Sequence, residues 1–151
     1  MIVAAGANVL RLGRWAGYRT TADRIVLVLH IGYLFVPVGF LLNGLAAFDV
    51  VLPSAGIHAW TVGAIGIMTL AVMSRATLGH SGRPLVAPLP LAISYGLLPL
   101  AAAARWLGSG LSGQWYFPGV LAAGALWILT FTFYIATLWP AFCGPRFQVK
   151  E

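Results

Sequence analysis

The sequence predicts an all-α integral membrane protein: a four-span helical bundle that follows a basic N-terminal segment. Of its 151 residues, 60% are hydrophobic and only 8% are charged, whereas about a quarter of the residues in a soluble domain are charged. The mean hydropathy is +0.90, and the apolar residues gather in four runs of membrane length. Because so little polar surface is available to cover a globule, lipid must be the solvent.

Residues 1–24 form the first predicted unit, a basic membrane-surface segment. Four arginines lie among apolar and aromatic residues in this segment: Arg11, Arg14, Arg19 and Arg24, with Leu10, Trp15 and Tyr18 between them. Two interpretations are open. The segment is a helix on the inner membrane surface, with its aromatic rings among the headgroups, or it is a flexible basic tail.

Residues 25–142 form the predicted four-span bundle, because a hydrocarbon core of about 30 Å needs about 20 apolar residues as helix. The predicted spans are 25–48, 57–78, 86–107 and 118–139. Pro37 and Pro99 fall inside spans and are expected to bend them. Residues 143–151 are the predicted cytoplasmic tail, and Cys143, the single cysteine, excludes an intrachain disulfide.

The basic residues predict the orientation of the bundle. Eight of the nine lie on one side of the predicted membrane, and only Arg105 lies on the other. Both termini are therefore expected to be cytoplasmic. The net charge of +6 is explained by this topology, so nucleic acid is not an expected partner and membrane lipid is.

The second span carries a stripe of polar and small residues. At 100° per residue, one face holds His58, Gly66, Thr69, Met73, Thr77 and His80. Lipid does not favour such a face, so it is expected to pack against protein or a cofactor. Gly63 and Gly66 in this span let a neighbouring helix approach closely. Met73 is either an adaptable core residue or a Cu(I) ligand beside imidazole.

The three histidines are the candidate ligands. An imidazole in hydrocarbon is costly and is usually functional. His30, on a face that continues through Tyr33, Pro37 and Gly44, is the first candidate, either for metal or haem ligation or for an interhelical hydrogen bond. His58 and His80 lie at opposite ends of one helix, about 33 Å apart, and cannot share one iron. His80 is either a ligand or an interface residue.

Two arginines near the end of the second span are candidates for binding a carboxylate, such as a haem propionate. Arg75 either binds such a carboxylate or extends to the headgroups. Arg83, in the tight turn before Pro84, either binds a phosphate or propionate or anchors the chain to the membrane. No span contains Asp or Glu, which weighs against a proton-driven carrier. Neither a Ser-His-Asp nor a paired-carboxylate arrangement is present, so the sequence contains no positive sign of an enzyme.

Two segments resemble the NnrS family of bacterial membrane proteins. They are Leu29-His30-Ile-Gly32-Tyr33 and the long motif from His58-Ala-Trp60-Thr-Val-Gly63 through Met68, Met73, Arg75 and His80 to Arg83-Pro84. The ending Trp139-Pro140 with Gly144-Pro145-Arg146 is similar but less specific. The resemblance covers almost the whole chain and corresponds to the C-terminal portion of longer family members.

The resemblance implies a multi-pass protein of the bacterial inner membrane that binds haem b and copper and is associated with nitric oxide response and denitrification. On this basis His30, His80, Arg75 and Arg83 are candidate cofactor-binding residues, and His30, His58, His80 and Met73 are candidate metal ligands. Partners implied are a second membrane chain or another copy of this one. Two alternatives stay open: a non-catalytic membrane interaction subunit without cofactor, and a b-type cytochrome that transfers electrons.

Overall fold

The computed structural model describes residues 1–110 and 113–146, which are almost entirely helical and contain no strand. Two short 3₁₀ turns and one π-helix interrupt the α-helices. In chain order the elements are α1 (Ile2–Arg14), η1 (Gly17–Thr20), α2 (Arg24–Ala46), α3 (Pro53–His58), η2 (Ala59–Gly66), α4 (Ile67–His80), α5 (Leu89–Gly110), η3 (Gly113–Trp115) and α6 (Tyr116–Cys143).

Four helical segments are long and apolar enough to cross a membrane, as predicted. They are Arg24–Ala46, Pro53–His80, Leu89–Gly108 and Tyr116–Cys143. The second and fourth are longer than the predicted spans, each with 28 residues. Pro53 begins the second segment four residues earlier than predicted, because proline suits the first turn of a helix, where its missing N–H costs nothing.

α2 begins where its N-terminal amides find a side-chain acceptor. The Asp23 carboxylate accepts hydrogen bonds from the backbone N–H groups of Ile25 and Val26, at 3.0 and 3.2 Å. Asp is among the best residues at this position, because it satisfies amides that have no partner within the helix. At the same end, Arg24 Nη1 donates to the Ala87 carbonyl at 3.0 Å, which joins the start of α2 to the chain just before α5.

α3, η2 and α4 form one continuous helical segment with a π-helix of eight residues, η2, in its middle. A π-helix closes i→i+5 hydrogen bonds, so its turns hold more residues than those of an α-helix. Residues that a count of 100° per residue from His58 assigns to one face therefore no longer lie on that face after η2. Three members of the stripe, Thr69, Met73 and His80, have exposed side chains, so the packing of this part of the stripe against protein or a cofactor stays a prediction.

Glycines let α2 and the α3–η2–α4 segment pack closely. Four glycines form what we call the glycine seam, and each faces a large side chain of the opposite helix: Gly32 faces Met68, Gly39 faces Trp60, Gly56 faces Asn43 and Gly63 faces Phe35. At every one of these positions a Cβ atom would overlap its neighbour. Trp60 also donates its indole N–H to the Val36 carbonyl at 3.1 Å. Small residues at helix crossings are the usual basis of close packing in membranes.

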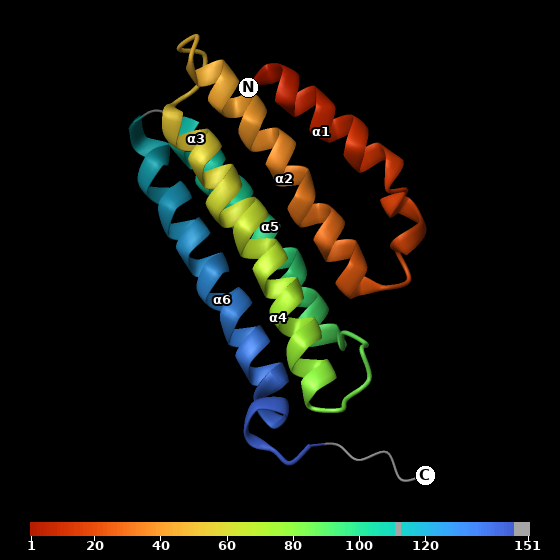
Figure 1. Ribbon diagram of the computed structural model, residues 1–151. Coiled ribbons are helices and arrows are strands. Elements are labelled where there is room, and N and C mark those ends of the chain that lie inside the picture. Colours follow the sequence, from red (N-terminus) through yellow and green to blue (C-terminus); the bar gives the residue numbers. More distant parts are fainter. Residues whose placement is uncertain (111–112, 147–151) are drawn as a thin grey trace.

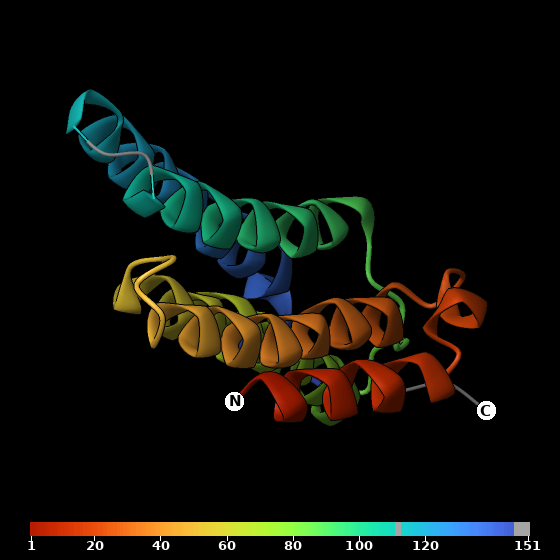
Figure 2. The ribbon, with the colours of Figure 1, turned by 90° about the horizontal axis from the view of Figure 1, so that it is seen from above.

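The other helices cover the two flanks of this pair. Figure 2 shows α1 on one side of α2 and α5 on the other. α1 runs antiparallel beside α2 (Figure 1), so that Ile2 contacts Gly44 and the chain after α1 contacts His30. The assignment of residues 1–24 to the membrane surface stays a prediction. α5 pairs with α6 through Gly108 and Gly119, whose backbones touch.

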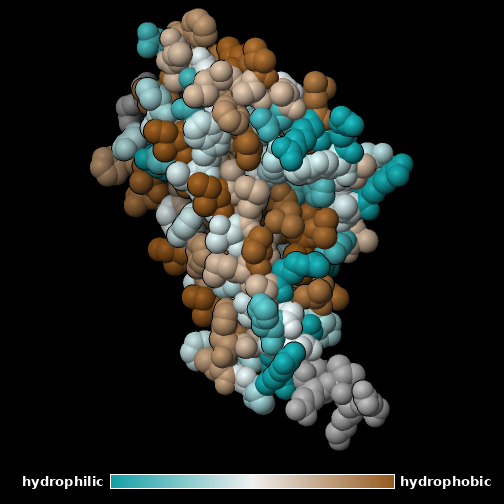
Figure 3. Space-filling view, in the orientation of Figure 1, coloured by the Kyte–Doolittle hydropathy of each residue, from teal (hydrophilic) through white to brown (hydrophobic). Residues whose placement is uncertain are grey.

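The outer surface is largely apolar, as a lipid-facing protein requires. α6 is the most exposed span, with only 17% of its most hydrophobic window buried. Figure 3 shows apolar side chains over much of the visible face and hydrophilic ones gathered over α1 and the turn that follows it. We call the end of the bundle that carries the 15–23 and 81–88 connections the basic end.

Candidate functional site

The three histidines lie in three separate hollows of the described structure. His30 lies between α1, η1 and α2; His58 lies between η2, α5 and α6; and His80 lies where the ends of α4 and α6 meet. No group of three or more His, Cys, Asp or Glu side chains placed to hold a metal ion occurs among the described residues. Any ligand of these histidines is therefore bound by one imidazole at a time from this chain.

The His30 imidazole is held in a defined tautomer. Its Nδ1 lies 2.9 Å from the carbonyl oxygen of Val26, one turn earlier in α2. Because a carbonyl oxygen only accepts hydrogen bonds, Nδ1 carries the proton and Nε2 of the neutral ring keeps its lone pair. This is the arrangement of metal-bound histidines, in which one ring nitrogen ligates and the other donates to the protein.

The surroundings of His30 are apolar and come mainly from the N-terminal segment. The His30 hollow has a volume of about 420 Å³ and is lined by Val9, Leu12, Gly13, Gly17, Tyr18, His30, Ile31 and Leu34. The Trp15 ring meets the imidazole edge-on at 6.1 Å between centroids. A Cβ atom at Gly17 would lie 2.6 Å from His30 Cδ2, so the turn passes directly over the ring. Arg14 and Arg19 flank these lining residues in the chain.

Hydrogen bonds fasten α1 over this face of α2. The Tyr33 hydroxyl donates to Asn8 Oδ1 at 2.6 Å, and Asn8 Nδ2 donates to the Ala4 carbonyl at 2.8 Å. The Trp15 and Tyr33 rings pack at 4.6 Å between centroids. Of the four residues that the sequence assigned to one face, three are thus contacted by residues 1–17: His30, Tyr33 and Gly44. Asn8 as the partner of Tyr33 and Trp15 as a neighbour of His30 were missed, since nothing in their spacing shows how α1 folds back.

Tyr33→Phe is expected to lower the free energy of unfolding by about 1 kcal/mol, because it leaves Asn8 Oδ1 without its donor. Thermal unfolding in detergent measures this effect. Tyr18→Phe is the matched control, since the Tyr18 side chain is 73% exposed and its substitution should leave stability unchanged. Equal losses in both variants would contradict the contribution assigned to the Asn8 bond.

His58 shares its hollow with a positive charge. The His58 hollow, of about 250 Å³, is lined by His58, Val62, Ala101, Arg105, Val120, Ala123, Gly124 and Trp127. The Arg105 guanidinium also lies over the Tyr116 ring, 5.7 Å from its centroid. A cation beside His58 disfavours binding of a metal cation there and favours an anionic or neutral group.

The remaining predicted site residues lie near the basic end and do not converge. His80 is exposed in a hollow of about 420 Å³ that also contains Thr77, Ser81 and Arg146. Arg83 donates from Nη2 to the Pro140 carbonyl at 2.7 Å and so ties the 81–88 connection to α6. Arg75 and Met73 are exposed on α4. None of these residues lines the His30 hollow.

Two tyrosine hydroxyls are buried in the bundle between α4, α5 and α6. Tyr95 and Tyr134 are 5% and 3% exposed, and no hydrogen bond of good geometry reaches either hydroxyl within the described residues. Ser74 lies near the first and Thr77 near the second. Sequence analysis missed this polar layer, because a tyrosine within an apolar run carries no sign of which way it faces.

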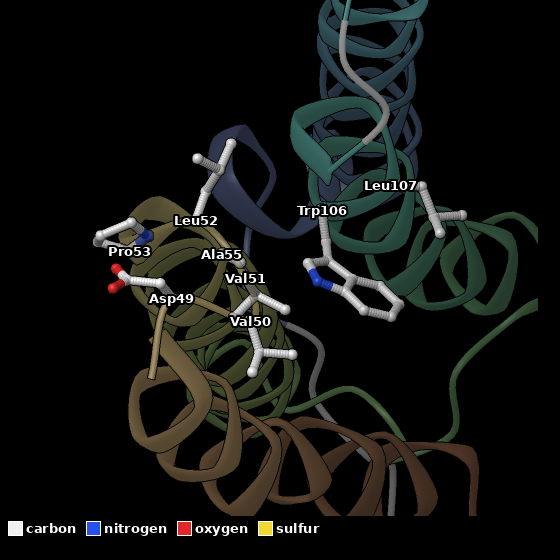
Figure 4. Close-up of a pocket in the computed structure, with 8 residues that line it drawn as sticks. All are labelled: Asp49, Val50, Val51, Leu52, Pro53, Ala55, Trp106 and Leu107. Atoms are coloured by element: carbon white, nitrogen blue, oxygen red, sulfur yellow. The ribbon is translucent and has the colours of Figure 1, made fainter. Parts of the chain in front are cut away.

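A further hollow lies at the end of the bundle opposite the basic end. It has a volume of about 400 Å³ and lies between the loop after α2 and the end of α5. Figure 4 shows Trp106 of α5 across from Val50 and Val51, with the Asp49 carboxylate turned away from the indole. Asp49 adopts a positive φ of 57°, which Asp tolerates better than most residues. No histidine is among the residues that line this hollow.

Within the bundle, the His30 imidazole is held in one orientation beside an apolar hollow. The four long apolar helices place this chain in the class of multi-pass α-helical membrane proteins. Within that class the chain belongs to the NnrS family: the family model described as NnrS protein matches residues 1–146. No curated protein and no solved structure matches the chain.

Proposed function

We propose that this chain is an NnrS-like membrane protein that binds haem b through His30 and acts in the response of a bacterium to nitric oxide. The observation that carries the proposal is the Nδ1 hydrogen bond to the Val26 carbonyl, which leaves Nε2 as the nitrogen without a proton on a ring that lines an apolar hollow. Membership of the NnrS family supports it. We further propose that the protein lies in the inner membrane with both termini cytoplasmic, because eight of its nine basic residues lie on one side of the predicted membrane.

The residues around His30 fit a haem better than a bare metal ion. A haem needs one strong axial nitrogen and an apolar surface for its macrocycle, whereas a metal ion without a macrocycle needs several protein ligands. Haem iron held by imidazole binds small diatomic molecules, and that chemistry belongs to the cofactor. His30 would hold the iron, and the Val26 carbonyl would keep the imidazole in the ligating tautomer.

Copper binding has weaker support from this chain. Met73, the thioether named as a Cu(I) ligand, is exposed and lines none of the three histidine hollows. No methionine or cysteine is among the residues that line these three hollows. Of the proposed propionate ligands, Arg75 and Arg83 lie away from His30, and Arg14 and Arg19 are the basic residues nearest in sequence to its hollow.

Titration of the purified full chain with haem b tests the proposal. The expected result is a saturable Soret band at one haem per chain, with a further shift when nitric oxide is added to the reduced form. A preparation that gives no saturable band would overturn haem binding. Reduction of the bound haem by a quinol, without response to nitric oxide, would instead indicate an electron-transferring cytochrome.

A second function, a membrane interaction subunit, is favoured by the outer face of α4. Thr69 and Met73 are exposed there, although lipid gives no advantage to such a face. A second copy or another membrane chain would cover it. This function does not exclude the first, and the mass of the detergent-solubilised particle distinguishes a monomer from an assembly.

A further inference from the structure

A long groove separates α2 from α5 on the flank of the bundle, and neither a histidine nor a glycine of the glycine seam lines it. Its volume is about 510 Å³, larger than that of any of the three histidine hollows. Its walls come from both helices and from the turn before α2. They are Thr21, Arg24, Leu27, Val28, Ile31, Ala92, Tyr95, Gly96 and Pro99.

The groove is polar at one end and apolar along the rest of its length. Thr21 and Arg24 lie at the basic end, and the Arg24 guanidinium is held there by its bond to the Ala87 carbonyl. That bond uses one of five N–H donors, and the side chain is exposed. From Arg24 to Ile31 the α2 wall rises about 10 Å, which is a length of acyl chain rather than of a small solute.

Gly96 keeps the α5 wall of the groove open. A Cβ atom at this position meets no heavy atom within 4 Å, whereas the glycines of the glycine seam each face a large side chain. The absence of a side chain at Gly96 is therefore not needed for the close approach of another helix of this chain. This absence instead deepens the groove.

The charge around the groove also determines which kind of molecule can bind there. The basic end carries Arg11, Arg14, Arg19 and Arg24, and the nearby Asp23 carboxylate accepts from the first amides of α2. Basic residues at the headgroup level attract anionic lipids, each by about 1 kcal/mol. A cationic headgroup would meet like charge there.

We propose that this groove binds one anionic phospholipid. Its phosphate contacts Arg24 and Thr21, and one acyl chain lies along Leu27, Ile31, Gly96 and Pro99. The lipid fills the gap between α2 and α5, helices that make few direct contacts, and so connects the two halves of the bundle. The proposal does not depend on haem binding, because its readout is lipid retention.

Native mass spectrometry of the detergent-purified chain, with phosphatidylglycerol or phosphatidylcholine added, tests the proposal. The wild type is expected to retain one phosphatidylglycerol and at least about fivefold less phosphatidylcholine. Gly96→Leu fills the groove and should abolish retention. Arg24→Gln should reduce retention of phosphatidylglycerol about fivefold and remove the preference between the two lipids.

Matched controls separate groove binding from general effects. Gly6→Leu makes the same change at a helical glycine that also faces open space but lies on α1, and Arg19→Gln removes a charge of the basic end outside the groove. Gly6→Leu should retain the lipid as the wild type does, and Arg19→Gln should retain more phosphatidylglycerol than Arg24→Gln, because Arg24 lines the groove and Arg19 does not. Equal retention of the two lipids, or equal loss in Gly96→Leu and Gly6→Leu, would overturn the proposal. A change of oligomeric state in Gly96→Leu with lipid retention intact would overturn it too, in favour of a second chain as occupant.

Discussion

Replacing His30 with alanine is expected to abolish the Soret band of the haem-loaded chain, whereas His58→Ala and His80→Ala should retain it. The three imidazoles lie in separate hollows, so neither of the others can take over the iron. Only His30 combines a proton fixed on Nδ1 with an apolar hollow beside the ring. Absorption at a fixed haem-to-protein ratio measures the effect.

His30→Asn provides the matched control for folding. The asparagine amide nitrogen takes the place of Nδ1 and keeps a donor for the Val26 carbonyl, but no nitrogen remains at the position of Nε2. This variant should unfold near the wild-type temperature and still bind no haem. Added imidazole should restore part of the Soret band in His30→Ala. A full band in His30→Asn would show that another residue ligates the iron.

Gly39→Ala is expected to lower the free energy of unfolding by about 2 kcal/mol, the usual range for an overpacked interface. The new methyl group would overlap the Trp60 indole. That ring cannot move freely, since it donates to Val36 at 3.1 Å and packs edge-on against Phe40 at 5.1 Å between centroids. Unfolding by a denaturing detergent, followed by tryptophan fluorescence, measures the loss.

Gly6→Ala is the control for the general effect of a glycine-to-alanine change. No atom lies within 4 Å of a Cβ at Gly6, so the change should stabilise by up to about 1 kcal/mol through helix propensity alone. Combining Gly39→Ala with Trp60→Phe should cost less than the sum of the two single changes, because the smaller ring makes room. A stabilising Gly39→Ala would contradict the glycine seam.

Predictions that rest on local chemistry are confirmed. Four runs of apolar residues became four spans, because backbone groups in lipid must be satisfied within a helix. Gly63 does allow a close helix approach, since Phe35 occupies the space beside it. His30, Tyr33 and Gly44 do share a face, because 100° spacing holds within the regular part of α2.

A spacing of 100° per residue is not sufficient to place residues across the second span. The side chains of Thr69 and Met73 are exposed in this chain, and the π-helix η2 changes the angle between residues before and after it. A π-helix depends on which hydrogen bonds form once the helices pack. Residue spacing alone gives no sign of it.

The amino-acid sequence by itself determined that this chain is a membrane protein with four apolar spans, a basic end and three histidines at different depths. These properties follow from composition and from the rise of a helix, and no long-range contact alters them. Only the tertiary structure decided that α1 covers His30, that the histidines occupy separate hollows, and that an open groove runs beside Gly96. The physical reason is that helix faces meet through matched shapes, such as Gly39 with Trp60, and shape matching depends on residues far apart in the chain.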